Sequence, residues 1–351
     1  MISYKLNKLR QNLFLKSFFM LYSNYKKLPP PRYVLWDCTR KCNLNCIHCG
    51  ASKERYEKEL KEKDVKKLID ELANIGVKTF SVTGGEPLTR PDLLSILKYA
   101  SDKGLQTGIA TNGFLINKET ASKIKNANVT SVQISLDGTK EIHNKIRKNP
   151  KSFDNAVNAI KLLNELDIPN VTAATTINPI NLNNIEELMT LLINLKIKSW
   201  RICVVMPIGR ANENKNLILS KDQLKQLFEF ILKNKNKLHI EVGENLTFLG
   251  EFEEKIRDSP LICPVGFKAC CIGVDGYVRG CPEMPDNKKF REGSILEKSF
   301  LEIWNNGFKR YRNREILKLD KKCSNCKNKE DCYGGCWVMR EGSIQCIYDL
   351  L

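Results

Sequence analysis

The 351-residue sequence contains no continuous run of about 18 apolar residues, which argues against a transmembrane helix. Its longest apolar stretch, residues 13–22, is interrupted by Lys16 and Ser17 and flanked by basic residues, as in a signal peptide or an amphipathic surface helix. No small-residue cleavage site follows, and three prolines at 29–31 end the stretch. We therefore expect residues 1–32 to be an amphipathic, basic segment that docks on the rest of a cytoplasmic protein.

Acidic residues are fewer than basic ones, 40 against 57, so the formal net charge is +17. Such an excess could serve an acidic partner such as nucleic acid or anionic lipid. The lysines are spread along the chain, however, and alternate with glutamate and asparagine, as in residues 53–67. That pattern is typical of a solvated helix face, and we expect no nucleic-acid partner.

Cysteine is nearly absent from the middle of the chain, where Cys203 alone lies between Cys49 and Cys263. The rest of the 14 cysteines form an N-terminal group, which begins at Cys38, and a C-terminal group, which ends at Cys346. Disulfides would not be needed by the long α/β region between the groups. Ligation of metal or clusters in a reducing compartment accounts better for this spacing.

From residue 33 to about residue 236, short β-branched runs alternate with longer helical patterns. The expected strands are 33–36, 79–82, 106–110, 131–135, 171–176 and 200–205, and the expected helices are 64–75, 91–103, 118–126, 153–166, 185–195 and 222–233. The first helix is expected to begin at Asp64 as its N-cap and to stop at Gly76. Six such units predict a parallel sheet, either doubly wound or closed toward a barrel, with its site at the carboxyl ends of the strands.

The C-terminal part has a different pattern, with short strands expected at 271–274 and 277–279, one helix over 300–316, and cysteine-rich loops. It has few apolar residues to bury, so we expect its fold to depend on bound metal. The predicted organisation is therefore a segment at 1–32, an α/β domain at 33–238 and a cysteine-rich domain at 239–351.

Cys42, Cys46 and Cys49 form a C-x3-C-x2-C triplet on the loop after the first strand. Three thiolates supply three corners of a [4Fe–4S] cluster and leave one iron open for an exogenous chelate. A structural zinc site is the alternative, and it would take Cys38 or His48 as a fourth ligand.

With the motifs that follow the triplet, the chain resembles the radical S-adenosylmethionine superfamily from residue 33 to its C-terminus. Gly84, Gly85 and Glu86 follow the second strand, where that family holds the methionine amino group. Paired glycines allow a close backbone approach, and a carboxylate suits an ammonium group. The resemblance implies a partial (β/α)6 TIM-type barrel.

The resemblance also implies contacts with S-adenosylmethionine at the ends of later strands. These residues are Asn112, Ser135, Asp137, Arg147, Val205 and Pro207. Ser135 and Asp137 would reach ribose hydroxyls, and the guanidinium of Arg147 would bind the methionine carboxylate. Lys148 stands where the family has a glycine, so we expect its loop to differ.

Such an enzyme takes an electron from an external donor of the flavodoxin or ferredoxin type. The resemblance implies that S-adenosylmethionine is then cleaved to a 5′-deoxyadenosyl radical, which abstracts a hydrogen from the substrate.

The C-terminal cysteines resemble the SPASM extension of this superfamily, which binds two auxiliary [4Fe–4S] clusters. The resemblance implies that Cys323, Cys326, Cys332 and Cys346 hold the outer cluster, and that Cys263, Cys281 and Cys336 hold the inner one with Cys270 or Cys271. If neither of that pair reached, the inner cluster would have an open iron. A zinc ribbon is the alternative. Cys38 and Cys203 are expected to be buried thiols.

The expected reaction of this oxidoreductase is maturation of a ribosomally made peptide or a protein side chain. Too few residues precede the first strand for a fused leader-binding domain, so we expect a direct groove or a separate leader-peptide-binding partner.

One alternative substrate is a small molecule, as in the decarboxylation of tetrapyrrole side chains in haem biosynthesis, a branch that residues 36–40 and 47–49 also resemble. Another is oxidation of a sulfatase residue. Sulfatase maturases have an aspartate base directly after the cysteine equivalent to Cys281, whereas here Pro282 intervenes and Glu283 is the candidate catalytic residue. A non-catalytic electron-transfer protein is the remaining class, and it would leave the cofactor-binding residues without a purpose.

Overall fold

The computed structural model describes residues 28–50, 58–246, 248–257, 262–285, 287–312, 321–332 and 334–341. Within these residues, a single ten-stranded sheet has the order β10-β9-β8-β1-β2-β3-β4-β5-β6-β7. Its strands are β1 (Tyr33–Asp37), β2 (Thr79–Thr83), β3 (Gln106–Thr111), β4 (Ser131–Ser135), β5 (Asn170–Ile177), β6 (Trp200–Val204), β7 (Ile240–Val242), β8 (Ala269–Ile272), β9 (Tyr277–Arg279) and β10 (Gly293–Ser294). All pairs from β8 through β1 to β7 are parallel. The alternating pattern predicts this for β1 to β6.

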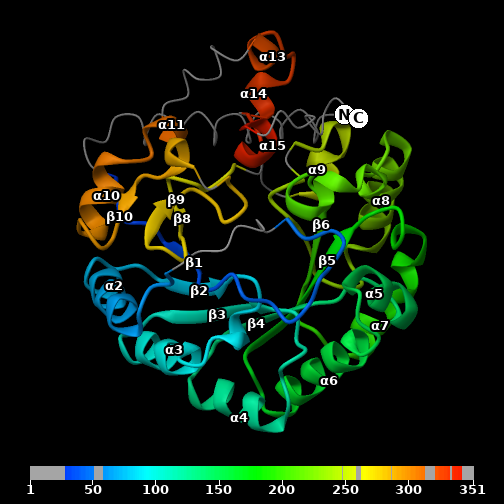
Figure 1. Cartoon of the computed structure of the whole chain (residues 1–351). Helices are drawn as coiled ribbons and strands as arrows, with labels where there is room; N and C mark the ends of the chain where they lie inside the picture. The colour runs from blue at the N-terminus through cyan, green and yellow to red at the C-terminus, as the bar shows by residue number, and fades with distance from the viewer. Residues whose placement is uncertain are drawn as a thin grey trace.

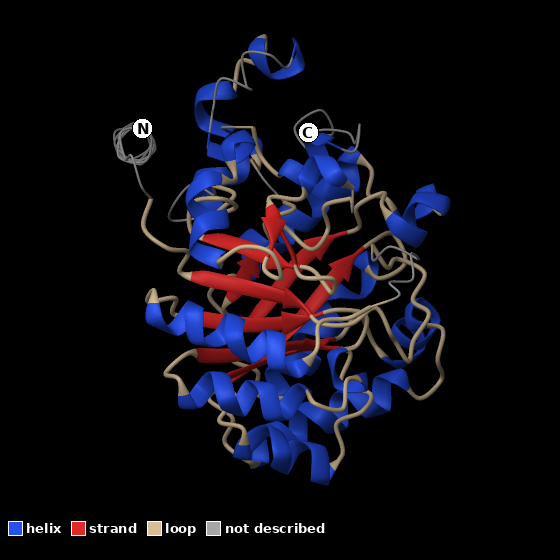
Figure 2. Cartoon of the chain, turned by 60° about the vertical axis from the view of Figure 1, so that its left-hand side comes forward, coloured by secondary structure: helices blue, strands red, loops and turns tan. Residues whose placement is uncertain are grey.

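Helices cover the outer side of this curved sheet (Figures 1 and 2). They are α2 (Glu62–Asn74), α3 (Leu93–Asp102), α4 (Lys118–Asn126), α5 (Lys140–Arg147), α6 (Ser152–Glu165), α7 (Ile185–Asn194), α8 (Lys221–Asn234) and α9 (Glu253–Ile256). The C-terminal region adds α10 (Phe300–Asn306), α11 (Lys309–Arg312), α13 (Lys321–Ser324), α14 (Lys329–Cys332) and α15 (Trp337–Glu341). None of the helices in the described part of the chain is long and apolar enough to cross a membrane. The apolar stretch at residues 13–22 lies outside the described residues.

The six predicted strands and their helices are confirmed, and the boundaries differ in a few places. Helix α2 begins before Asp64, and its N-cap is Lys61, so the predicted N-cap is wrong. Asp64 instead lies in the first turn with Glu62, where an acidic side chain favours the positive end of the helix dipole. Helix α5 was not predicted, because it is only eight residues long and its buried side chains include His143 and Arg147 rather than an apolar stripe.

The single helix predicted over 300–316 is wrong, because α10 ends at Asn306 and α11 begins at Lys309. Phe308 lies between them with a φ of 60°, a left-handed conformation that cannot continue a helix. Its backbone N–H donates to a carboxylate oxygen of Glu292 at 2.5 Å instead of an intrahelical carbonyl. The aromatic ring of Phe308 is buried against Trp304 and Tyr311.

The sheet continues beyond residue 239, where the second domain was expected to begin. Strand β8 lies parallel to β1, with Tyr33 opposite Ala269 and Trp36 opposite Ile272. The antiparallel hairpin of β8 and β9 then extends this edge of the sheet. The start of the cysteine-rich region is therefore hydrogen-bonded directly to the strand that leads into the first cysteine triplet.

Candidate cofactor site

The first cysteine triplet lies on the loop that follows β1, at the carboxyl end of the sheet. Cys46 is buried, Cys49 is half-buried and Cys42 is exposed. Burial raises the pKa of the Cys42 thiol, and the neighbouring Cys46 and Cys49 raise that pKa further because a second thiolate nearby is unfavourable. The three predicted ligands are therefore gathered in one place, where a bound cluster would remove this repulsion.

The donor set fits a four-iron cluster better than a single ion. Within the described residues, no three histidine, cysteine or acidic side chains are close enough to hold one metal ion. Cys38 is fully buried, and the charges nearest its thiol are those of Asp37 and Arg90 rather than the triplet. In a [4Fe–4S] cluster each thiolate binds a different iron. Three separated cysteines can therefore hold such a cluster without a fourth protein ligand.

Gly84 and Gly85 allow the loop after β2 to pass against the cysteine loop. The backbone N–H of Gly85 donates to the carbonyl of Thr39 at 2.7 Å, and that of Glu86 donates to the carbonyl of Lys41 at 2.7 Å. A Cβ on Gly85 would lie 2.2 Å from the Lys41 oxygen, and one on Gly84 would lie 2.5 Å from the Thr39 oxygen. In this structure, the two glycines therefore accommodate the protein's own backbone.

The buried carboxylate of Glu86 joins the ends of β2 and β3. It accepts hydrogen bonds from the Thr111 hydroxyl at 2.6 Å and from the backbone N–H of Asn112 at 2.8 Å. Asn112 in turn donates through Nδ2 to Asn43 Oδ1 on the cysteine loop at 2.8 Å. Burial raises the pKa of Glu86, although these donors oppose it. Its contact with a methionine ammonium stays a prediction.

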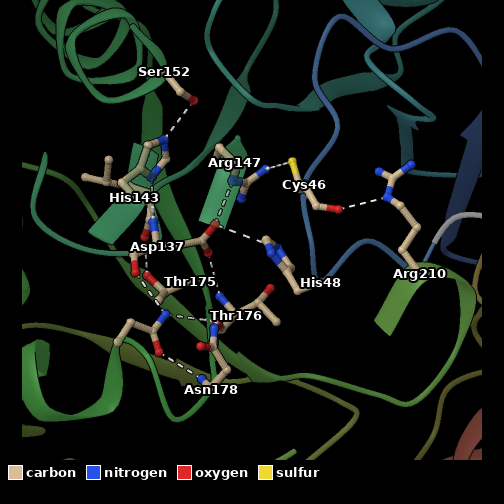
Figure 3. A network of polar contacts seen from close by, with 12 residues as sticks. Cys46, His48, Asp137, His143, Arg147, Ser152, Thr175, Thr176, Asn178 and Arg210 are labelled. Atoms are coloured by element: carbon tan, nitrogen blue, oxygen red, sulfur yellow. Dashed lines mark hydrogen bonds and ion pairs between the residues drawn. The ribbon is translucent and has the colours of Figure 1, made fainter. Parts of the chain in front are cut away.

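Asp137 and Arg147, which were predicted to bind different parts of the cofactor, form a buried ion pair (Figure 3). Arg147 Nε donates to Asp137 Oδ2 at 2.6 Å, and the backbone N–H of Thr176 donates to Asp137 Oδ1 at 3.0 Å. Burial alone would raise the pKa of Asp137, but Arg147 and the nearby histidines outweigh it and lower that pKa to about 2. Lys148, at the glycine position of the family, adopts a left-handed conformation with a φ of 53° and ends α5.

Arg147 also connects this pair to the cysteine loop. Its Nη1 donates toward Cys46 Sγ at 3.7 Å, while His48 Nε2 lies 3.7 Å from Asp137 Oδ2 (Figure 3). Burial lowers the pKa of His48 to about 4, so its imidazole is neutral near pH 7. His48 therefore faces the ion pair rather than serving as a fourth ligand.

His143 is a site residue that the motifs did not identify. Its Nδ1 accepts from the backbone N–H of Asp137 at 3.0 Å, so the proton is on Nε2, which faces Ser152 Oγ at 3.0 Å (Figure 3). Burial lowers the pKa of His143 to about 3 and keeps the ring neutral. The signal available in the sequence was its spacing, since His143 precedes Arg147 by four residues, one helical turn.

The loop after β6 holds the cysteine loop from the opposite side. Arg210 donates through its backbone N–H to the carbonyl of Cys49 at 3.0 Å and through Nε to the carbonyl of Cys46 at 2.8 Å. Gly209 has a φ of 56°, and a Cβ there would meet the Cys49 and Gly50 oxygens at 2.7 Å. Val205, which is buried, and Pro207, which is half-buried, were predicted to contact S-adenosylmethionine and precede this contact in the chain. Ser135 is half-buried at the end of β4.

Three of the cysteines predicted for the inner auxiliary cluster lie together. Burial raises the pKa of Cys281 well above its ordinary value, and Glu283, Cys336 and Cys263 raise it further. Cys270 and Cys271 are consecutive residues of β8 and so point to opposite faces of the sheet. The charges that act on Cys271 are those of Asp37 and Arg279, and Arg312 acts on Cys270.

The predicted outer-cluster residues Cys323, Cys326 and Cys332 are half-buried on or beside α13 and α14. The N–H of Asn328 donates to Cys326 Sγ at 3.4 Å, as for a thiolate held in a turn. Cys346, the fourth predicted ligand, lies outside the described residues.

Glu283 brings a carboxylate from the cysteine-rich region to the first cysteine loop. Its Oε2 would lie 2.7 Å from a Cβ on Gly50, the residue after Cys49. Burial raises the pKa of Glu283, and the negative charge of Asp37 adds to this rise while Arg40 opposes it. The candidate catalytic residue therefore borders the predicted cofactor site.

Comparison with known proteins identifies two domains. Residues 36–192 match the radical SAM superfamily, and residues 263–327 match SPASM, an iron–sulfur cluster-binding domain. The AdoMet-dependent heme synthase of Methanosarcina barkeri is 30% identical over 323 residues, which cover 87% of this chain and 90% of that protein. The mycofactocin maturase MftC of Mycobacterium tuberculosis is 30% identical over 320 residues, which cover 89% of this chain and 80% of that protein.

Solved structures share the fold at lower sequence identity. Streptococcus suis SuiB bound to S-adenosylmethionine superposes with a TM-score of 0.73 at 18% identity, covering 91% of this chain and 76% of SuiB. The anSMEcpe protein with bound AdoMet superposes with a TM-score of 0.68 at 21% identity, covering 90% of this chain and 91% of that protein. At these identities the likeness concerns the fold.

Proposed function

This chain belongs to the radical S-adenosylmethionine superfamily and carries a SPASM domain, and from that premise we propose that it matures a ribosomally made peptide or a protein side chain. It is an enzyme that binds a [4Fe–4S] cluster and S-adenosylmethionine in its radical SAM domain and auxiliary iron–sulfur clusters in its SPASM domain. The substrate and the bond that changes are the subject of the proposal.

The proposed ligands of the first cluster are Cys42, Cys46 and Cys49. Cys263, Cys281 and Cys336 are proposed for the inner auxiliary cluster, supported by the electrostatic proximity of their thiols. Cys323, Cys326, Cys332 and Cys346 are proposed for the outer cluster, supported by their order in the sequence. Cys270 and Cys271 are less suited to the inner cluster, because the charges that act on their thiols are those of Arg312 for Cys270 and of Asp37, Arg279 and Arg40 for Cys271, not those of the thiols around Cys281.

When bound, the reduced cluster and S-adenosylmethionine supply a 5′-deoxyadenosyl radical that abstracts hydrogen. The protein's contribution is positional. Arg147 holds Asp137 ionised at the end of β4, and Glu86 fixes Asn112 against the cysteine loop. Arg210 fixes the carbonyls of Cys46 and Cys49 from the other side. Together, these contacts preorganise the loop that presents the three thiolates.

The charge balance of the site carries the proposal of a peptide substrate. Arg40 lies 2.9 Å from the Asp37 carboxylate, and Arg279 lies 3.6 Å from the same oxygen. Arg147 is likewise paired with Asp137. These guanidinium groups are therefore engaged by the protein's own carboxylates, and Glu283 adds an acidic group at the same place. A site whose arginines are already paired in this way suits the neutral amides of a peptide better than a molecule with several carboxylates.

Two observations on similar proteins agree with this proposal. The similar protein MftC is named a maturase, and a solved SuiB structure contains the precursor peptide SuiA. We further propose an external one-electron donor of the flavodoxin or ferredoxin type and a cytoplasmic location, where thiolate clusters are protected from oxidation. A separate leader-peptide-binding protein is proposed as a possible partner.

The direct test is incubation of the anaerobically reconstituted enzyme, S-adenosylmethionine and a reductant with candidate precursor peptides. A mass change in one peptide, matched by 5′-deoxyadenosine and absent for Cys46→Ala, is expected. Formation of 5′-deoxyadenosine without a mass change in any candidate would count against a peptide substrate.

Side-chain decarboxylation of a tetrapyrrole is the second candidate. It is favoured by the heme synthase similarity and by the Fe-coproporphyrin III synthase of Methanosarcina barkeri, which is 31% identical over 342 residues. Titration with an iron porphyrin, followed by absorbance, separates the two candidates, since tight binding is expected only for this one. Sulfatase-like oxidation is a third candidate. It is supported only by the place of Glu283 near Cys281 and Gly50.

A further inference from the structure

A buried ion bridge connects the two cysteine-bearing parts of the chain. Asp37, the last residue of β1, has its Oδ2 atom 2.9 Å from Arg40 Nη2 and 3.6 Å from Arg279 Nη2. The side chains of Asp37 and Arg279 are 2% and 0% exposed. One carboxylate is thus shared by two guanidinium groups that reach it from different parts of the chain.

Each arginine of this bridge lies next to a predicted cluster ligand. Arg40 precedes Cys42 by two residues, and Arg279, the last residue of β9, precedes Cys281 by two residues. The backbone reinforces this placement, because β1 pairs with β8 and Cys271 on β8 is opposite Arg279 on β9. Asp37 therefore lies between the segment that leads to Cys42 and the segment that leads to Cys281.

Close packing restricts the bridge further. A Cβ on Gly273 would lie 2.6 Å from Arg279 Nη2, so the guanidinium lies close against the β8–β9 turn. At the other end of the cysteine loop, Glu283 lies against Gly50. The 279–283 segment therefore contacts the first cysteine loop near both of its ends, at Asp37 and at Gly50.

Because of this arrangement, a movement of the first cysteine loop relative to the 279–283 segment is energetically unfavourable. Separating Asp37 from Arg279 would break a contact between two buried charges, which is less favourable than breaking one between exposed charges. Burial therefore makes the bridge sensitive to the distance between the two loops.

We propose that Asp37 is a positioning residue that sets the separation and relative orientation of the first cluster and the inner auxiliary cluster. The inference rests on the ligand roles proposed for Cys42 and Cys281, and it is independent of the substrate. Its test therefore needs no substrate, and the iron content of the unmodified protein, about twelve atoms per chain for three clusters, checks the ligand roles separately.

The experiment is pulsed dipolar EPR on the reconstituted full chain after reduction with dithionite, comparing Asp37→Asn with the unmodified protein. Asparagine keeps the size of the side chain but removes its charge. We expect unchanged iron content and a shifted or broadened distance distribution between the reduced clusters. The matched control is Asp154→Asn, which breaks an exposed ion pair with Lys140 far from both cysteine groups in sequence, and whose distribution should match that of the unmodified protein.

A second variant covers the case in which Asp37→Asn does not assemble its clusters. Arg279→Lys keeps the positive charge but shortens its reach to Asp37, and it should shift the distribution in the same way to a smaller extent. Distributions that superpose on that of the unmodified protein, in whichever of these variants retains its iron, would overturn the proposal.

Discussion

Arg147 Nε lies 2.6 Å from Asp137 Oδ2, and the same guanidinium reaches toward Cys46 Sγ at 3.7 Å. The two residues come from the end of α5 and from the loop after β4, so the ion pair links two elements to the cysteine loop (Figure 3). Both groups are buried, and each is the main reason that the other keeps its charge.

Replacing Arg147 by methionine should destabilise the protein by about 3 kcal/mol, because it leaves the Asp137 carboxylate buried without its partner. Anaerobic urea unfolding at pH 7 measures this change. The double variant Arg147→Met/Asp137→Leu should recover most of the loss, since it removes both charges. Equal stability of the single variant and the unmodified protein would show that the pair is solvated.

The same pair predicts a pH dependence with a definite sign. The pKa of Asp137 is lowered from 3.8 to about 2 in the folded protein, so its stabilising contribution is present above pH 3.8 and is lost as the pH falls through 2. In Arg147→Met, the largest effect that opposes burial is removed, so burial raises the pKa of Asp137. The difference in the free energy of unfolding between Arg147→Met and the unmodified protein should therefore become smaller from pH 7 to pH 5. Urea unfolding curves at both pH values measure this change.

His143 should make the protein less stable in mild acid. Its pKa is lowered from 6.5 to about 3 by burial, so between these values the unfolded chain binds more protons than the folded one. The free energy of unfolding then falls with pH, by about 2 kcal/mol from pH 6.5 to pH 5. The free energy of unfolding of His143→Gln should depend less on pH. The control is His239→Gln, which should keep the pH dependence of the unmodified protein because the His239 side chain is 73% exposed. Parallel profiles for all three proteins would contradict the buried, neutral assignment.

Gly85→Ala should cost the protein its first cluster. The new Cβ would lie 2.2 Å from the Lys41 oxygen and 2.7 Å from the Lys41 carbonyl carbon, and backbone atoms cannot rotate away as side chains do. The cysteine loop must therefore move, and about four of the twelve irons should be lost after reconstitution. Gly104→Ala is the control, since its Cβ meets nothing within 4 Å and costs only about 1 kcal/mol of backbone strain. Full iron content in Gly85→Ala would show that the two loops can separate.

The sequence predicted the barrel strands well because short β-branched runs, such as residues 131–135 and 170–177, lie between polar turns and alternate with helical patterns. It also predicted which loops meet, since parallel strands end at one edge of the sheet. The hydrogen-bond and ion-pair partners of individual side chains could not be predicted from the sequence. Glu86 and Asp137 were expected to face a ligand, whereas the structure engages them with Asn112 and Arg147.

The contacts that the sequence did not reveal join residues far apart in the chain. Arg210 reaches Cys46 across 164 positions, and Arg279 reaches Asp37 from the cysteine-rich region. Neither arginine belongs to a local periodic pattern, and only the arrangement of strands in the sheet brings them to the cysteine loop. The division of helix 300–316 was missed for a related reason, because Glu292, 16 positions earlier, accepts a hydrogen bond from the Phe308 N–H.

The ligands of the inner auxiliary cluster give the last prediction. Cys281 has Cys336 and Cys263 as neighbours, whereas Cys271 faces Asp37 and Arg279 on the sheet and has its pKa raised to about 12 by burial. The charges that act on Cys270 and Cys271 are those of Arg312 and of Asp37, Arg279 and Arg40, not those of the thiols around Cys281. We therefore expect Cys281→Ala to lose about four irons per chain, and Cys270→Ala and Cys271→Ala to keep all of about twelve. Iron and sulfide analysis, with the EPR spectrum of the reduced protein, measures this difference. Loss of a cluster in Cys270→Ala or Cys271→Ala would identify the fourth ligand and contradict this prediction.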